Sequence, residues 1–372
     1  MDDRIFAKGR AWIELSTANL DNNINCLRSL LPPGCELMPA IKANAYGHGV
    51  EIIAKQLSDR GIKAFCVATA TEGVELRRLG VRGTILVLGY THPELFPMLR
   101  CFDLTQTVVD GEYAGALNAY GHPIRVHIGI DTGMHRLGLR ADDIDGIARL
   151  FSMENLQIDG VYTHLCVEDT KNQADSDFTR GQGASFNKAL TELRARGLEI
   201  PKAHILSSYG LLNYPDLGGA YARVGVALFG VKSSPDDLAN HSEGLKPVLS
   251  LKTRVASVRK LKKGESMGYG LAYTAKEDKT IAALSIGYGD GVPRALSCGV
   301  GRVLINGKRA KIIGRVCMDQ TMVDISGIDA KQGDEAILIG EGLPIEEMAA
   351  RANTISNEIL SRLSERLGRI AI

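Results

Sequence analysis

The chain has 372 residues, of which 45% are hydrophobic and 23% are charged, and its formal net charge is +1 at pH 7. These values are ordinary for a globular protein, and the balanced charge gives no electrostatic basis for binding nucleic acid or another acidic surface. No apolar stretch reaches the roughly 18 residues of a membrane helix, and the N-terminus carries no signal peptide, so we expect the chain as given to be soluble.

The cysteines suggest neither a disulfide framework nor a zinc site. Their number is odd and no two form a CxxC pair, which favours free thiols in a reducing compartment. We therefore predict no metal. The cysteines are Cys26, Cys35, Cys66, Cys101, Cys166, Cys298 and Cys317.

Short apolar segments alternate with helical patterns over the first part of the chain. Residues 11–15 fit a strand, Ser16 and Thr17 offer caps for a helix to about Leu31, and a Pro-Pro-Gly sequence stops that helix. Further strands are expected at residues 36–41, 64–68, 84–88, 104–108, 124–130, 158–163, 202–206 and 221–225, with helices between them, for example at 50–60, 71–79 and 176–196. Eight βα units in roughly 230 residues predict an α/β fold of the TIM (β/α)8 barrel type, with a doubly wound open sheet as the competing fold.

The pattern changes near residue 246, where strand-like segments begin to follow one another with little helix between them. We therefore predict a TIM barrel at residues 12–245 and a mostly-β domain at residues 246–372, and we expect residues 1–11 to pack on the second domain. The second domain's expected strands are 249–258, 280–284, 302–305, 310–313, 321–324 and 335–339, followed by helices at 344–351 and 357–367.

A single lysine stands at the end of the first expected barrel strand. The apolar run from Leu37 to Ile41 ends at Lys42, and small residues and glycines follow before a helical pattern begins near Val50. Desolvation at a strand end lowers the pKa of an amine and makes it a nucleophile. The alternative is an ordinary lysine whose stem packs while its amine reaches solvent.

Other polar side chains follow the later strands, at the end of a barrel where active sites form. Arg136 lies in the sequence Asp-Thr-Gly-Met-His-Arg, His164 and Ser208 each follow a strand, and Arg223 begins the sequence Arg-Val-Gly-Val. From residue type alone, each has an ordinary alternative: a surface arginine, a core histidine with satisfied hydrogen bonds, or, for Gly225, a turn glycine.

The sequence Ile-Lys-Ala-Asn-Ala-Tyr-Gly-His-Gly at residues 41–49 resembles the lysine motif of the alanine racemase family, whose enzymes depend on pyridoxal 5′-phosphate (PLP). Three blocks of the second domain, at residues 268–274, 286–294 and 314–320, resemble family blocks in the family's order. The resemblance extends from Trp12 to Arg369. It implies a PLP-dependent amino-acid racemase that acts through two bases.

The resemblance also assigns roles to residues. Lys42 and Tyr269 are implied to be the catalytic pair, and His164 is implied to hydrogen-bond both Tyr269 and Arg223. Arg223 is implied to face the pyridine nitrogen, where a permanent cation keeps that nitrogen unprotonated, weakens the cofactor as an electron sink and suppresses transamination. The implied phosphate-binding groups are Tyr46, Ser208 and the N–H groups of Gly225 and Val226, and the implied substrate-binding groups are Arg136, Met318 and Asn357.

Three positions depart from the usual family pattern. Gly129 stands where many members have a carbamylated lysine behind the carboxylate-binding arginine, so we expect an anion or water to replace it. Ser207 stands where asparagine is common. Asn357 stands where the family has a tyrosine, which enlarges the pocket and offers an amide; the alternative is that Asn357 merely caps the last helix.

This combination is similar to the serine/alanine racemase domains of vancomycin-resistance operons. It implies interconversion of L- and D-serine, with weaker activity on alanine, and a supply of D-serine for modified peptidoglycan precursors. In such proteins a membrane domain precedes the racemase domain, so we expect a location on the cytoplasmic side, tethered through such a domain. Tyr269 and Met318 lie outside the barrel, and the resemblance implies that a partner subunit supplies them, so we also expect a homodimer with shared active sites.

Three alternatives stay open at this stage. One is a housekeeping alanine racemase. Another is a non-catalytic PLP-carrier barrel, although such proteins lack a second domain. A third is a barrel decarboxylase acting on basic amino acids, although its glycine-rich phosphate loop and its catalytic cysteine motif are absent from the sequence.

Overall fold

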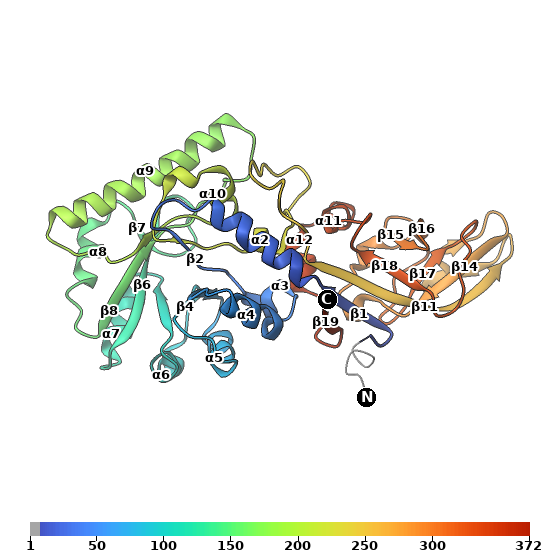
Figure 1. Ribbon diagram of the computed structural model, residues 1–372, viewed down its shortest axis with the longest axis horizontal. Coiled ribbons are helices and arrows are strands. Elements are labelled where there is room, and N and C mark those ends of the chain that lie inside the picture. Colours follow the sequence, from blue (N-terminus) through green and yellow to red (C-terminus); the bar gives the residue numbers. More distant parts are fainter. Residues whose placement is uncertain (1–7) are drawn as a thin grey trace.

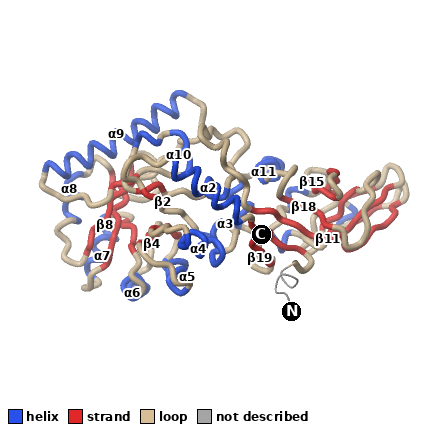
Figure 2. The backbone as a smooth tube through the Cα atoms, viewed as in Figure 1, coloured by secondary structure: helices blue, strands red, loops and turns tan. Residues whose placement is uncertain are grey.

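A computed structural model describes residues 8–372 as two domains joined side by side, with helices surrounding the first and strands dominating the second (Figures 1 and 2). The strands of the first domain are β2 (Glu36–Leu37), β3 (Ala64–Val67), β4 (Thr84–Val87), β5 (Thr105–Val108), β6 (Ile124–Asp131), β8 (Leu156–Tyr162), β9 (Ala203–His204) and β10 (Tyr221–Ala222). The short strand β7 (Leu139–Arg140) pairs only with β6.

The eight main strands close into a ring. Strands β3, β4, β5, β6, β8 and β9 are parallel neighbours in that order, and β10 pairs in parallel with β2. Backbone hydrogen bonds join these groups on both sides: for example, Arg223 N–H donates to Leu206 O at 2.9 Å, and Ile41 N–H donates to Cys66 O at 3.0 Å. The predicted TIM barrel is therefore confirmed, and the open sheet is excluded because the ring has no free edge.

Helices cover the outside of this ring. The long helix α9 and the smaller helices α4 to α8 lie around it in Figure 1. Their bounds, with those of the helices at the barrel ends, are α2 (Thr17–Ser29), α3 (Lys42–Tyr46), α4 (Val50–Asp59), α5 (Ala70–Arg78), α6 (Phe96–Cys101), α7 (Gly111–Ala119), α8 (Ile144–Leu150), α9 (Gln173–Ala195) and α10 (Ser208–Asn213). In residues 8–372 no helix is long and apolar enough to cross a membrane.

The second domain is built on an eight-stranded sheet with the order β14-β17-β16-β15-β18-β11-β1-β19, and β14 also pairs with β11. Its strands are β1 (Ala11–Leu15), β11 (Leu249–Leu261), β14 (Lys279–Leu284), β15 (Arg302–Ile305), β16 (Lys308–Ile312), β17 (Thr321–Asp324), β18 (Glu335–Ile339) and β19 (Gly368–Ala371), with the hairpin β12 (Ser266–Met267) and β13 (Tyr273–Thr274) beside them. Two short helices, α11 (Ile345–Ala352) and α12 (Ser356–Ser361), precede β19.

Two details differ from the sequence prediction. Trp12 to Leu15, which we had assigned to the barrel, belong to the second sheet, because β1 fills the space between β11 and β19 and all its residues are buried. The predicted helix 357–367 ends at Ser361, because Ser364 N–H bonds to Asp290 O and draws the chain onto the second domain. The sequence also predicts that residues 1–11 pack on the second domain. Of these, residues 1–7 lie outside the part of the chain that the structure describes.

Candidate active site

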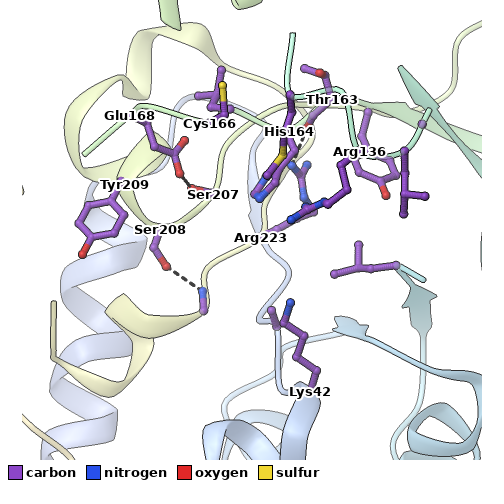
Figure 3. A pocket seen from close by; sticks show the side chains of 18 of the residues that line it. Lys42, Arg136, Thr163, His164, Cys166, Glu168, Ser207, Ser208, Tyr209 and Arg223 are labelled. Carbon is purple, nitrogen blue, oxygen red and sulfur yellow. Dashed lines mark hydrogen bonds between the residues drawn. The ribbon is translucent and has the colours of Figure 1, made fainter. Parts of the chain in front are cut away.

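A cavity of about 470 Å³ opens at the carboxyl ends of the barrel strands. Figure 3 shows Lys42, Arg223, His164 and Arg136 converging on it, with Ser208 at its far side. The sequence-predicted residues that line it are Lys42, Tyr46, Arg136, His164, Ser208, Arg223, Gly225, Val226 and Asn357. Only Asn357 among these comes from the second domain.

The segment after Lys42 is a left-handed turn. Ala43, Asn44, Ala45 and Tyr46 have φ angles of 51°, 53°, 54° and 51°. This conformation costs an L-residue about 1–2 kcal/mol, because Cβ approaches the following carbonyl. Side chains fix the turn from both ends: Glu72 Oε1 accepts from Ala43 N–H at 2.8 Å, and Asn44 Oδ1 accepts from Val50 N–H at 2.6 Å.

The second domain supports the same turn. A Cβ at Gly47 would lie 2.0 Å from the carbonyl oxygen of Leu360 in α12, so only glycine fits there. Arg369 Nε donates to Gly47 O at 2.9 Å. On the barrel side, the His48 ring stacks on Phe229 with centroids 3.9 Å apart, and burial lowers the pKa of His48 to about 4, so this imidazole is neutral.

A cradle of small groups lies at the Ser208 side of the cavity. Ser208 Oγ accepts from the N–H groups of Gly225 at 2.8 Å and Ala227 at 3.3 Å. A Cβ at Gly225 would lie 2.7 Å from Tyr46 Oη, so glycine keeps that space open. Burial raises the pKa of Tyr46 to about 12, which keeps its hydroxyl a hydrogen-bond donor. Hydroxyl and backbone N–H donors around one space are a typical arrangement for a phosphate group.

Arg223 is buried beneath the cavity and is held by neutral groups. Its Nη1 donates to His204 Nδ1 and its Nη2 to Thr163 O, each at 2.6 Å, and its guanidinium lies 4.8 Å from the centre of the Tyr162 ring. Because arginine only donates, the His204 proton must be on Nε2, which lies 2.9 Å from His127 Nδ1. Burial, followed by the charge of Arg223, holds the pKa of both histidines well below their usual range.

This arrangement corrects one expectation. We predicted a hydrogen bond from His164 to Arg223, but among residues 8–372 His164 Nδ1 is buried without a partner. The Arg223 guanidinium donates instead to His204 Nδ1 and to the carbonyls of Thr163 and Ile205. Burial, with the nearby Arg223 charge, lowers the pKa of His164 to about 3, so its imidazole is neutral. Sequence reasoning did not predict a role for His204. A histidine inside the expected barrel strand 202–206 is the signal that could have identified it.

Arg136 lies at the opposite side of the cavity and has no ion-pair or hydrogen-bond partner within the described chain. The nearby Asp131 carboxylate is occupied by the N–H groups of Gly133 and His135 and by the His135 ring. Gly129 also lines the cavity, and a Cβ there would lie 3.2 Å from Val108 O. The Arg136 guanidinium is therefore available to bind a carboxylate.

Asn357 enters the cavity from α12, where it is the second helical residue. The helix N-cap is Ile355 and no side chain caps this helix, so Asn357 does not have the capping role considered above. Its Oδ1 is buried and has no partner among the described residues. A buried amide oxygen without a donor is costly, and a ligand that supplies one removes that cost.

Two predicted site residues lie away from this cavity. Tyr269 and Met318 are on the surface of the second domain, where they are 70% and 53% exposed, and neither lines the cavity of its own chain. Leu271 and Tyr288 are exposed on the same domain. A single chain therefore provides the cofactor side of the predicted site without these two groups.

Comparison with known proteins gives the same family as the motifs. One family model, "Alanine racemase, N-terminal domain", matches residues 15–233, and "Alanine racemase, C-terminal domain" matches residues 248–371. The chain belongs to the alanine racemase family. This family depends on PLP, and the Ser208 cradle with the open space at Gly225 fits the cofactor's phosphate.

The individual relatives fall into two groups. The chain is 43% identical to an amino-acid racemase of Enterococcus faecalis and 37% identical to a serine/alanine racemase of Enterococcus gallinarum, covering 96% of this chain and 51% of each relative. It is 38% identical to an alanine racemase of Carboxydothermus hydrogenoformans over 97% of this chain and 99% of that one. A solved alanine racemase of Clostridium difficile 630 superposes with a TM-score of 0.92 at 34% identity, covering 98% of this chain and 96% of that chain.

The chain thus spans about half the length of the Enterococcus relatives that it matches.

Sequence reasoning also missed a buried acid in the cavity wall. Glu168 is 7% exposed, its Oε1 accepts from Ser207 Oγ, and its Oε2 has no partner within residues 8–372 (Figure 3). Burial raises the pKa of Glu168 to about 7, from an ordinary value of 4.5. Between these two pH values the folded chain holds this proton and the unfolded chain does not.

This pKa shift predicts a loss of stability with rising pH. The stability is fully present below about pH 4.5 and is lost as the pH rises through 7, by up to about 3 kcal/mol. Glu168→Gln removes the ionisation. The free energy of unfolding of this variant, minus that of the wild type, should therefore increase from pH 4.5 to pH 8. Urea unfolding measures it, with the exposed Glu75→Gln as control. Equal pH slopes in wild type and Glu168→Gln would contradict the assignment.

Proposed function

We propose that this chain is a PLP-dependent racemase that interconverts L- and D-serine and, more weakly, L- and D-alanine. The observation that carries the proposal is one cavity that joins a strand-end lysine, a phosphate cradle, an unpaired arginine and an unpaired asparagine amide. The relatives named amino-acid racemase and serine/alanine racemase support the same class of reaction. An alanine racemase with little serine activity is the second candidate, supported by the Carboxydothermus relative.

The cavity divides into a cofactor side and a substrate side. Lys42 would hold PLP covalently, and Tyr46, Ser208 and the N–H groups of Gly225 and Val226 would hold its phosphate. When bound, PLP supplies an electron sink that makes the Cα proton of the attached amino acid acidic. Arg223 would keep a fixed positive charge beneath the ring, since its partner His204 is neutral. Arg136 would bind the substrate carboxylate.

Racemisation requires that a proton leave Cα on one face and return on the other. Lys42 Nζ would serve the D-face and Tyr269 Oη the L-face. A phenol is a poor base unless its proton has an acceptor, and the unpaired Nδ1 of neutral His164 is a suitable atom. Because Tyr269 lies on the surface of its own chain, we propose that a second subunit brings it and Met318 to the cavity, in a homodimer.

Chiral analysis of the product tests the reaction itself. The purified protein supplied with PLP should convert L-serine into D-serine, and Lys42→Ala should lose both this activity and the visible absorbance of lysine-bound cofactor. Lys55→Ala, on the exposed face of α4, is the matched control. Release of CO₂ in place of D-serine, or normal activity in Lys42→Ala, would contradict the proposal.

Subunit mixing tests the shared site. Lys42→Ala and Tyr269→Phe should each be nearly inactive, but random mixing should restore roughly a quarter of wild-type activity, because half of the dimers then contain one intact site of two. Unmixed samples of each variant are the controls, and exchange is verified by mass. No recovery after verified exchange would mean that each chain uses its own Tyr269.

Asn357 is the proposed basis of substrate choice. Its amide is much smaller than the tyrosine of alanine-specific relatives, and it both donates and accepts hydrogen bonds, so it suits a CH₂OH group. Alanine would leave the buried Oδ1 unpaired, as it is in the structure. One neutral hydrogen bond contributes about 0.5–1.5 kcal/mol, which corresponds to a preference of roughly tenfold at most.

The variant Asn357→Tyr tests this assignment. It should lose serine activity and keep or gain alanine activity, because the phenol ring fills the space for the hydroxymethyl group. The measurement is kcat/KM for both substrates, with Asn353→Tyr, on the turn before α12, as a control for a new tyrosine in this region. If the serine-to-alanine ratio does not change, another residue determines the preference.

The cellular setting is a separate proposal. From the resemblance to vancomycin-resistance racemase domains described above, we propose that D-serine made by this chain supplies modified peptidoglycan precursors and that the reaction takes place on the cytoplasmic side. A preceding membrane domain stays a prediction.

A further inference from the structure

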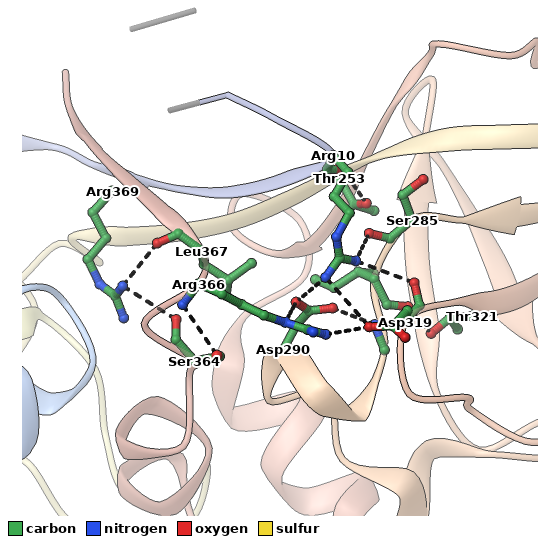
Figure 4. A network of polar contacts seen from close by, with 12 residues as sticks. Arg10, Thr253, Ser285, Asp290, Asp319, Thr321, Ser364, Arg366, Leu367 and Arg369 are labelled. Carbon is green, nitrogen blue, oxygen red and sulfur yellow. Dashed lines mark hydrogen bonds and ion pairs between the residues drawn. The ribbon is translucent and has the colours of Figure 1, made fainter. Parts of the chain in front are cut away.

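Four charged side chains connect the two loops that carry Tyr288 and Met318 (Figure 4). Asp290 is fully buried, and its Oδ1 accepts from Arg10 Nη2 and from Arg366 Nε, each at 2.7 Å. Arg366 Nη2 also donates to Asp319 Oδ1 at 2.8 Å. Arg10 Nη1 donates to Ser285 O at 2.6 Å. Two acids and two arginines therefore form one charge-balanced network.

The backbones of these loops are tied as closely as their side chains. Tyr288 N–H donates to Cys317 O and Gly289 N–H to Met318 O, each at 2.9 Å. A Cβ at Gly287 would lie 2.2 Å from Cys317 O, and one at Gly289 would lie 2.7 Å from Arg366 Nη2. The segment that contains Met318 is thus held both by backbone hydrogen bonds to the neighbouring loop and by the charged network.

Within the described chain, the backbone N–H of Met318 is left without a hydrogen-bond acceptor. No hydrogen-bond partner for it occurs within residues 8–372, although the Met318 carbonyl and its neighbour Cys317 are both bonded. Asp319, the next residue, brings a carboxylate close to it, and Arg366 neutralises that carboxylate. Without this partner, the Asp319 charge would repel any carboxylate that approached Met318 N–H.

We propose that Arg366 and Asp319 are positioning residues that set the affinity for the substrate carboxylate in the partner subunit's site. Their ion pair holds the Met318 segment in place and cancels the negative charge beside its free N–H. This inference rests on the proposed function, since it assumes that the second domain of one subunit completes the cavity of another. Neither residue lines the cavity of its own chain, so we expect cofactor retention to be independent of them.

The test uses two substitutions of Asp319, whose side chain is half exposed and therefore tolerates change. Asp319→Asn keeps an oxygen that accepts from Arg366, whereas Asp319→Ala removes it. Asp319→Ala should raise KM for serine about three- to tenfold with kcat within about twofold, and Asp319→Asn should stay near the wild type. PLP absorbance and the thermal midpoint should be unchanged in both.

A charge rescue makes the test sharper. Arg366→Ala exposes the Asp319 charge and should raise KM further, and Arg366→Ala with Asp319→Asn should recover part of that loss. Glu347→Gln, which breaks the ion pairs with Arg309 and Arg351 elsewhere in the same domain, is the matched control and should leave KM unchanged. If Arg366→Ala does not fold, because buried Asp290 loses a partner, the two Asp319 variants decide the question alone.

The outcomes distinguish a failure of the proposed function from a failure of the role assigned to Arg366 and Asp319. An inactive wild type would overturn the proposed function. An active wild type whose KM is the same in Asp319→Ala would overturn this inference and leave the proposed function intact. A fall in thermal midpoint with unchanged KM would assign the network to stability alone.

Discussion

The left-handed turn from Ala43 to Tyr46 is the constraint on which the candidate site depends. Both the Lys42 side chain, just before this turn, and the Tyr46 side chain, at its end, line the same cavity. The conformation is unfavourable for every residue in it, so its surroundings must hold it. Glu72 accepts from the Ala43 N–H of the turn, Asn44 within the turn accepts from Val50 N–H at the start of α4, and α12 lies against Gly47. The second domain therefore helps to shape the barrel's own site.

Electrostatics in the cavity follow from burial combined with careful pairing. Arg223 is buried, and its side-chain hydrogen-bond partner is His204, which burial keeps neutral and which in turn contacts the neutral His127. Its charge is therefore neither cancelled by an acid nor shared with a second cation. These neutral hydrogen-bond partners fix the orientation of the Arg223 side chain and leave its positive charge uncancelled. Glu168, also buried, holds its proton up to about neutral pH and adds little opposing charge.

Much of this architecture could be predicted from the sequence, for identifiable reasons. The barrel strands are short apolar runs separated by helical patterns, so the fold follows from local signals. The nine cavity-lining residues were predicted from the resemblance of their motifs to the alanine racemase family. Contacts between distant segments could not be read in this way. Three features depend on contacts between residues that are far apart in the sequence and leave no periodic pattern in it. They are the pairing of β1 with β11, the hydrogen bond from Arg223 to His204, and the burial of the Glu168 carboxyl group.

The position of β1 has a consequence for how the two domains move. Because β1 and β11 are adjacent strands of one sheet, the whole barrel is an insertion between two neighbouring strands, connected at both ends rather than by one linker. The two connections are themselves bonded, with Ser16 N–H donating to Val248 O at 2.9 Å. An insertion that is connected at both ends has fewer ways to rotate than a domain on a single linker. The lysine turn and α12 meet at Gly47, so their contact is supported by two backbone connections between the domains as well as by the hydrogen bond from Arg369.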